Sequence, residues 1–385
     1  MTDGSAHLVG TADETLVQHA QFGDSTKILA KVLARYRFGV DLFAERLPAV
    51  AQIASAVERL NDVDARRLFC DPLVRLKLEE AFSDLEGRRL ASPHPLEAFL
   101  VRALEALPLG LCESHMPSHW PIRSEHPKWL WAVADSDDAH ARELHAAFDG
   151  IFAKDSKGGG GVLLNPDAAS RRKIEEAIAL LSTLLPHSGA AALRHIDAIA
   201  LLQAKIEGGT VLSAAGGDVT PSTVFLSLEE LGNPWDIAGC LLHEGLHMKL
   251  FDAGRSLALA TAPAETIQVP WRPVRWSIVR AVYAYHVYVH LSLFKAAALV
   301  AEKSTIEQFG NPADYVSRPH AMSVVNNGSV SRFGRSIDRA RYLGEQLLGP
   351  WSHLLSAQGK SLVTWLSRAL APVSNDVFGD STEQA

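Results

Sequence analysis

The amino-acid sequence predicts a mainly helical protein that contains a small β-hairpin or sheet. Apolar residues recur along most of the chain at the spacing of amphipathic helices. Two stretches, Gly209–Ala214 and Ser222–Leu228, are instead β-rich and are separated by the turn-forming Gly216-Gly217-Asp218. Hydrophobic residues make up 47% of the chain and charged residues 21%, the balance of a globular protein with a substantial core. We therefore expect a helical core rather than a cupin-type β-barrel.

Residues 1–155 are expected to form an N-terminal helical region. Apolar residues there are spaced so that they share one face of successive helices, which are predicted over Ser25–Glu45, Ala49–Leu60, Asp71–Glu86 and Leu96–Leu107. The stretch Lys154–Gly161 follows and holds four consecutive glycines. Because no Gly-Lys-Ser/Thr comes after them, these glycines favour a flexible connection over a phosphate-binding loop.

Residues 156–373 are expected to form a second region, and the polar residues 374–385 a disordered tail. In the second region Asn165-Pro166-Asp167 caps a predicted helix that runs to about Leu185, before Pro186. The two β-rich stretches lie between the helices predicted over Ala190–Lys205 and Asn233–Gly254. The other predicted helices cover Ala190–Lys205, Asn233–Gly254, Val274–Ala301, Ser331–Leu348 and Trp351–Leu370.

The most informative motif is His243-Glu244-Gly245-Leu246-His247, an HExxH pattern. It lies in a well-marked helix, because Asn233 is a good N-cap and Pro234 suits the first helical position. Two histidines four residues apart share one helix face, so both imidazoles can reach one cation. In zinc hydrolases with this pattern the glutamate is the general base. The sequence therefore predicts His243 and His247 as metal ligands and Glu244 as a catalytic residue.

A catalytic metal needs at least one more protein ligand, and the sequence offers His286, His290 and Glu265. A short-range third histidine is absent, because the HExxHxxGxxH pattern does not continue through residues 248–253. Glu265 lies between prolines, a poor position for a rigid ligand. His286 falls within an apolar and aromatic helical stretch, where a buried imidazole needs a partner. We favour His286, with His290 as the alternative; a histidine bonded within the core is the competing interpretation.

Arg272, Arg275 and Arg280 lie just before this stretch. A guanidinium grips a carboxylate through two parallel hydrogen bonds, so arginines near a metal helix suit a carboxylate-bearing substrate or cosubstrate. The competing interpretation is that each arginine pairs at the surface with the acidic excess of the chain.

Composition excludes several classes of protein. The net charge of −7 argues against a general nucleic-acid binder. The longest apolar run, Trp276–Ala301, contains Arg280, His286, His290 and Lys295, so we expect no membrane span. Three cysteines form neither a zinc cluster nor a disulfide framework, and residues 1–10 lack the pattern of a secretory signal. We therefore expect a cytoplasmic protein.

The chain resembles the HExxH-motif proteins of peptide-modification gene clusters over roughly Arg171–Leu370. The resemblance is carried by the Leu242–Leu250 motif segment, Pro270-Trp271-Arg272, the Tyr285-His286-Val287 helix and Leu354–Gly359. Characterised members of that family are iron(II)- and 2-oxoglutarate-dependent β-hydroxylases of ribosomal peptides. The resemblance implies that His243 and His247 bind iron with His286 as third ligand, and that Arg272 or Arg275 binds the carboxylate of 2-oxoglutarate.

The function expected from these features is an oxygenase that uses Fe(II), 2-oxoglutarate and O2. It would hydroxylate an unactivated carbon, at a β-position, of an amino-acid residue in a peptide or peptide-like natural product. One alternative is a zinc metallopeptidase in which Glu244 activates a metal-bound water. A second is a non-catalytic peptide-binding protein. The sequence leaves the substrate and the oligomeric state open.

Overall fold

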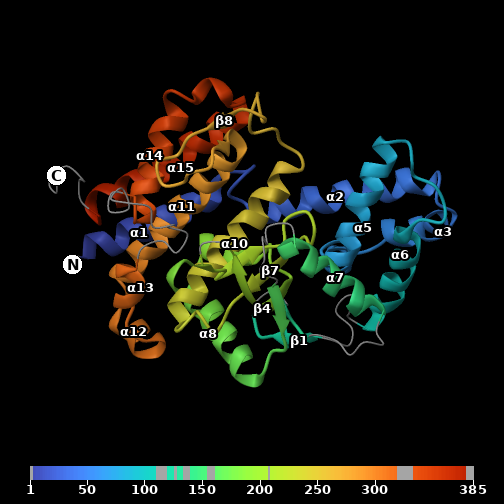
Figure 1. The fold of residues 1–385 in the computed structure, drawn as a ribbon, viewed down its shortest axis with the longest axis horizontal. Coiled ribbons are helices and arrows are strands. Elements are labelled where there is room, and N and C mark those ends of the chain that lie inside the picture. The colour runs from blue at the N-terminus through green and yellow to red at the C-terminus, as the bar shows by residue number, and fades with distance from the viewer. Residues whose placement is uncertain are drawn as a thin grey trace. The chain divides into compact units, whose positions relative to one another are not determined.

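The computed structural model describes residues 3–109, 119–124, 128–132, 139–153, 161–206, 209–318 and 333–378. The chain is mainly helical with a small sheet, as predicted (Figure 1). It divides into two compact units, and each is assembled from separate stretches of sequence. The first unit comprises Met1–Ser25, Lys173–His195 and Leu231–Ala385, and the second comprises Thr26–Arg172 and Ile196–Glu230. The expected regions 1–155 and 156–373 stay a prediction.

Helices make up most of the second unit, and the four predicted in this part of the chain are confirmed. Their bounds, with the helices the sequence analysis did not single out, are α2 (Ser25–Ala44), α3 (Pro48–Glu58), α4 (Asp62–Phe69), α5 (Pro72–Glu86), α6 (Pro95–Ala106), the short 3-10 helix η1 (Leu107–Leu109) and α7 (Ala139–Ala153). Local signals fix several of the helix starts. The Asp71 side chain, for example, accepts hydrogen bonds from the backbone N–H groups of Leu73 and Val74 at the start of α5.

The second unit also holds the sheet. Its strands are β1 (His119–Ile122), β2 (Lys128–Trp131), β3 (Gly161–Leu164), β4 (Ala198–Ile206), β5 (Gly209–Thr210), β6 (Ser213–Ala215) and β7 (Thr223–Leu226). Strands β2, β4 and β7 are parallel neighbours in that order, whereas β1, β3, β5 and β6 pair antiparallel. The predicted hairpin is confirmed in β6 and β7, where Ser213 pairs with Leu226. The Gly209 stretch, in contrast, pairs with the end of β4.

The predicted helix Ala190–Lys205 is wrong. Helix α9 (Ser188–Leu193) ends early, and Ala198–Ile206 forms β4 at the centre of the sheet. Residues 198–202 are all buried, because a central parallel strand is covered on both faces. A continuous apolar run of this kind cannot be assigned to helix or strand by periodicity alone, since both structures bury every residue.

The first unit is helical and is arranged around α11. Its elements are α1 (Asp3–Gln18), most of α8 (Ala168–Leu184), α9, α10 (Pro234–Gly254), α11 (Ile278–Leu299), α12 (Lys303–Phe309), α13 (Ala313–Ser317), α14 (Ser336–Leu348), the 3-10 helix η3 (Ser352–Leu354), α15 (Ala357–Asp376) and the hairpin β8 (Thr266–Ile267) with β9 (Trp276–Ser277). Helix α11 packs against α1, α10, α14 and α15. In Figure 1, α10 and α11 are drawn in yellow and orange. This packing brings the two histidine-bearing helices together.

Helix α11 begins later than predicted, because Trp276 and Ser277 pair with β8 instead. The Ser277 side chain then caps the helix by accepting from the backbone N–H of Arg280. At the other end of the unit, α15 continues through Asp376, and the rest of the expected disordered tail, residues 379–385, lies outside the described residues. The expected flexible connection at 154–160 lies outside them too.

Among the described residues, no single helix is long and apolar enough to cross a membrane, although α11 and α12, bent by 103°, pass that test as a pair by length and composition.

Candidate metal centre

The helix that carries the HExxH motif is fixed at its start and buried along its length. Pro234 is its first residue, and the Asn233 side chain accepts a hydrogen bond from the backbone N–H of Asp236 at 3.0 Å, as the sequence predicted. Both faces of α10 are largely buried. A helix that is buried on all sides belongs to the protein interior, so the motif is held in a rigid setting.

His243, Glu244 and His247 form a group that could hold a metal ion. Their ligand atoms lie within 4.8 Å of one another, and no other such group of His, Cys, Asp or Glu was found among the described residues. The two Nε2 atoms are 3.2 Å apart. Two metal–nitrogen bonds of about 2.0–2.1 Å would separate their nitrogens by about 2.9 Å at a right angle and about 3.3 Å at a tetrahedral angle. The spacing therefore fits one shared cation, and it does not choose the metal.

The electrostatics of the two histidines also suit metal binding. Burial lowers the pKa of His243 to about 4, and burial together with the neighbouring His243 lowers the pKa of His247 to about 4. Both rings are therefore neutral near pH 7, and neutral imidazole is the form that binds a metal. Glu244 is 7% exposed, with Oε1 4.0 Å from Nε2 of His243. Its carboxylate thus stands beside the position that a shared cation would take.

His286 is completely buried on α11, and neither of its ring nitrogens has a hydrogen-bond partner among the described residues. Burial lowers its pKa well below the usual value, and the nearby His290, Lys249 and His247 lower it further. A buried polar ring without partners is costly unless a ligand satisfies it. In this structure His286 lies outside the compact group formed by the motif residues. Its role as the third ligand stays a prediction.

The other two candidates for the third ligand are placed differently. His290 is also completely buried; its Nδ1 lies 2.8 Å from the backbone oxygen of His286, and its Nε2 has no partner among the described residues. Glu265 is exposed in the loop before β8, and its backbone oxygen accepts from the N–H of Ile278. Like His286, both lie outside the compact group.

The predicted arginines separate into two kinds. Arg275 is exposed and donates from Nε to the Thr266 hydroxyl at 3.0 Å, so it braces the β8–β9 hairpin. Arg272 is half-buried, and its Nε has no acceptor among the described residues. Burial lowers the pKa of Arg272, and the charges of Arg339 and Arg280 lower it further. Arg280 is exposed beside the Trp276 ring, and its charge contributes to the lowered pKa of His247.

Sequence reasoning missed Arg339, on α14, which is 1% exposed. Its Nε donates to the backbone oxygen of Phe333 at 2.8 Å, and its guanidinium carbon lies 5.4 Å from the Trp271 ring centroid and 5.5 Å from that of Tyr288. The Trp271 ring N–H is buried and lacks an acceptor among the described residues. We call Trp271, Arg272, Tyr288 and Arg339 the arginine–aromatic cluster. It holds two buried N–H donors without acceptors, on Trp271 and Arg272, an arrangement that suits an anion.

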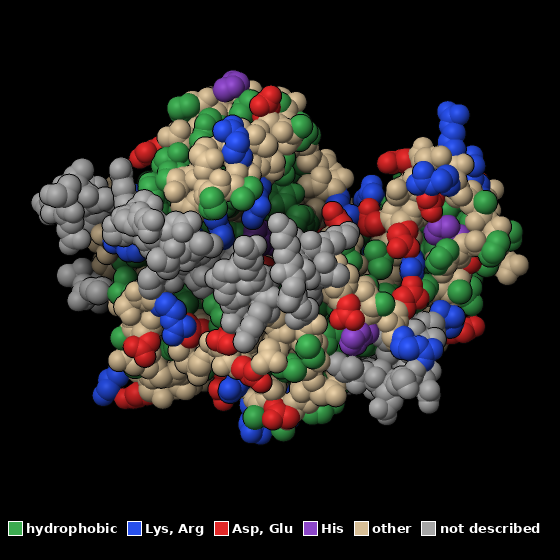
Figure 2. Space-filling model, viewed as in Figure 1, with side chains coloured by type: hydrophobic (Ala, Val, Ile, Leu, Met, Phe, Trp, Pro, Cys, Tyr) green, Lys and Arg blue, Asp and Glu red, His purple; other side chains and the backbone are tan. Residues whose placement is uncertain are grey.

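This cluster differs from the ordinary charged surface. Among the coloured residues of the face drawn in Figure 2, acidic and basic side chains are interspersed. In the arginine–aromatic cluster, by contrast, Arg339 is buried and Arg272 half-buried, and the pKa of Arg272 is lowered by burial and by the charges of Arg339 and Arg280, whereas Tyr288 raises it. Sequence spacing alone could not have found it, because Arg339 is far along the chain from Arg272.

A second polar network lies on the face of α10 opposite the motif, and the sequence did not reveal it. His195 is completely buried, with Nδ1 2.7 Å from Asp252 Oδ2 and Nε2 3.1 Å from Ser25 Oγ. The residues resemble a hydrolytic triad, but the Ser25 hydroxyl donates to the backbone oxygen of Ala191 at 2.8 Å. The network therefore joins α10 to α9 and to Ser25 within the first unit, and we assign it a structural role.

No family model matches the chain, and no curated protein matches it. The fold and the site therefore define its class: a mainly helical protein with an HExxH group that could hold a metal ion. This points to a metalloenzyme in general terms.

Proposed function

We propose that the protein is an iron(II)- and 2-oxoglutarate-dependent oxygenase that hydroxylates a β-carbon of an amino-acid residue in a peptide or peptide-like natural product. One observation carries this choice: the charge of Arg280 acts both on the HExxH group and on the arginine–aromatic cluster. It contributes to the lowered pKa of His247 and also to the lowered pKa of Arg272. A metal group and acceptor-free N–H donors that lie within reach of the same guanidinium charge suit a cosubstrate that binds the metal and also carries a remote carboxylate.

Bound iron(II) would supply the activation of O2, coupled to decarboxylation of 2-oxoglutarate to succinate. The protein's own residues have simpler tasks. His243 and His247 hold the cation in their neutral form, and we propose that His286 completes the ligand set through one of its unpartnered nitrogens. Glu244, which is buried beside His243, orients a ligand or water at the metal.

The carboxylate of 2-oxoglutarate is proposed to bind Arg272 and the ring N–H of Trp271. Both have a buried donor without an acceptor among the described residues, whereas Arg275 already donates to Thr266. The Arg339 guanidinium lies over the Trp271 ring, and this cation–π contact helps to hold the ring in place. Of the two arginines predicted from the sequence, the geometry therefore favours Arg272.

The second candidate function is a zinc metallopeptidase. It is favoured by the position of Glu244, whose carboxylate lies 4.0 Å from the His243 nitrogen and could take a proton from a metal-bound water. The 3.2 Å separation of the two histidine nitrogens is also compatible with tetrahedral zinc. This reading leaves the acceptor-free donors of Trp271 and Arg272 without a role.

The test is succinate release from 2-oxoglutarate by metal-free protein reconstituted anaerobically with iron(II) or zinc(II) and then exposed to oxygen. We expect succinate with iron only, and none from His243→Ala. Arg272→Ala should raise the KM for 2-oxoglutarate about tenfold or more, through loss of a charge-assisted contact. The matched control, Arg275→Ala, should leave that KM nearly unchanged.

One result would overturn the proposed reaction, and another would overturn only the proposed carboxylate contact. Absence of succinate with iron, together with tight stoichiometric zinc binding, would move the peptidase to first place. Equal effects of Arg272→Ala and Arg275→Ala on the KM would remove the assignment of the carboxylate contact while leaving the oxygenase chemistry in place.

A further inference from the structure

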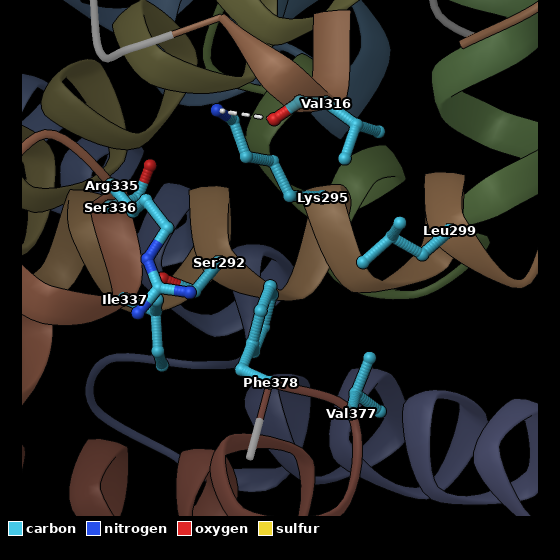
Figure 3. A pocket seen from close by; sticks show the side chains of 9 residues that line it. All are labelled: Ser292, Lys295, Leu299, Val316, Arg335, Ser336, Ile337, Val377 and Phe378. Atoms are coloured by element: carbon cyan, nitrogen blue, oxygen red, sulfur yellow. Dashed lines mark hydrogen bonds between the residues drawn. The ribbon is translucent and has the colours of Figure 1, made fainter. Parts of the chain in front are cut away.

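The first unit contains a cavity of about 250 Å³ that the metal site does not use. Figure 3 shows it between the C-terminal half of α11, the end of α13, the start of α14 and the residues that follow α15. Lys295 marks its α11 side and lies about 13 Å further along that helix than His286, at a rise of 1.5 Å per residue. The lining residues are Ser292, Lys295, Leu299, Val316, Arg335, Ser336, Ile337, Val377 and Phe378.

One wall of the cavity is cationic. Lys295, 8% exposed, donates to the backbone oxygens of Arg318 at 2.8 Å and Val316 at 3.4 Å, and its ammonium carries a third donor hydrogen. Arg335 binds Asp338 through Nε and Nη2, both at 2.8 Å, which offsets part of its charge. None of the described residues that line the cavity is acidic. The wall therefore favours a negatively charged occupant.

A buried hydroxyl without a partner lies in the same wall. Ser336 is 1% exposed, and its Oγ makes no hydrogen bond to the described residues. It is the first residue of α14, a helix of 13 residues whose start has no side-chain cap. The first N–H groups of a helix lack partners within it and carry partial positive charge. The hydroxyl, the helix start and the two cations thus converge on one cavity.

Much of the remaining lining is apolar. Aliphatic side chains come from Leu299, Val316, Ile337 and Val377, and Figure 3 shows the ring of Phe378 extending from the segment after α15 toward α11. A bare inorganic anion would leave these groups without contacts, whereas an aliphatic chain would fill the space.

We propose that this cavity binds a small carboxylate with a short aliphatic chain, of the size of isovalerate. Its carboxylate contacts Ser336, Lys295 and the start of α14, and its chain packs on Leu299 and Phe378. The site is separate from the metal centre, and it stands whatever reaction that centre performs.

The charges around Lys295 agree with this assignment. Burial lowers the pKa of Lys295 to about 8, with Arg318, Arg335 and Arg339 lowering it and only Asp236 raising it. A bound anion stabilises the protonated amine, so the affinity for the carboxylate falls as the pH rises above about 8.

The test is calorimetric titration of the full-length protein with isovalerate. Ser336→Ala should weaken binding about fivefold, the effect of one lost hydrogen bond, and Lys295→Met about tenfold or more. Leu299→Trp should abolish binding by filling the cavity. The control, Lys303→Met, removes a lysine whose side chain is 90% exposed and should change nothing. Ser336 makes no side-chain hydrogen bond to the described residues, so the melting temperature of Ser336→Ala should match that of the wild type and would show that the variant is folded.

Two comparison ligands sharpen the result. Phosphate and 3-methylbutanol should both bind more weakly than isovalerate. Binding of phosphate as tight as that of isovalerate would overturn the apolar part of the proposal, and equally tight binding of the alcohol would overturn the anionic part. Absence of isovalerate binding, or binding unchanged in both Ser336→Ala and Leu299→Trp, would overturn the site.

Discussion

Helix α10 has two buried polar faces, and they differ in how their polar atoms are satisfied. On one face, Asp252 binds His195 at 2.7 Å and Lys249 donates to the backbone oxygen of Gly23 at 2.7 Å. On the other, His243 and His247 approach one another with neutral rings, opposite the unpartnered His286 of α11. The first face completes its hydrogen bonds within the chain. Near the second face, both ring nitrogens of the buried His286 lack hydrogen-bond partners among the described residues, as expected of a binding site rather than a structural network.

The largest expected effect is the loss of metal binding from the motif face. His243→Ala removes one of two nitrogens 3.2 Å apart, so stoichiometric binding of zinc(II) or iron(II) should disappear. The metal-free variant should lose less stability than a variant of Asp252, because Glu244 Oε1 lies 4.0 Å from the His243 ring whereas Asp252 lies 2.7 Å from His195. Metal titration and denaturant unfolding of the same samples measure both. Retained tight binding would show that the motif is not the metal site.

The next largest effect is expected on the opposite face of α10, where a substitution should lower the stability of the fold rather than abolish metal binding. Asp252→Ala removes the carboxylate that binds the buried His195. This loss is expected to lower the free energy of unfolding by about 3–5 kcal/mol. Asp314→Ala, at an exposed position, is the control and should cost little. Denaturant unfolding gives both values. A loss below about 1 kcal/mol for Asp252→Ala would remove the structural role of this network.

The most gradual effect is the pH dependence that the two motif histidines give to stability. Their pKa is about 4 in the folded protein and about 6.5 in the unfolded chain, so the unfolded state binds more protons between these values. Stability of the metal-free protein should therefore fall as the pH drops from about 6.5 toward 4, by at most about 1.4 kcal/mol per pH unit for each histidine.

The double variant His243→Ala/His247→Ala should lose this part of the slope. Unfolding measured at several pH values between 4.5 and 7 gives the comparison. An identical slope in the double variant and the wild type would mean that the two rings are not held neutral by burial.

Residues 233–254 show how much of the site could be read from the sequence. The Asn233 cap, Pro234 and the end at Gly254 were predicted correctly, because caps and helix stops act over a few residues. The pairing of His243 with His247 followed from helical geometry alone. Arg339, which lies against Trp271, and His195, which binds Asp252, could not be placed in the same way. Nothing in their local sequence says which distant helix each will meet.

Local interactions thus determined the positions of most helices, the hairpin of β6 and β7 and the HExxH face of α10. Tertiary structure decided the rest. It made Ala198–Ile206 a central strand, because burial between β2 and β7 outweighs the helical preference of an alanine- and leucine-rich run. It also withdrew Arg272 and Arg339 from water and enclosed Ser336 in a cavity. Burial is set by which residues far apart in the chain pack together, and a pattern along the sequence does not contain that information.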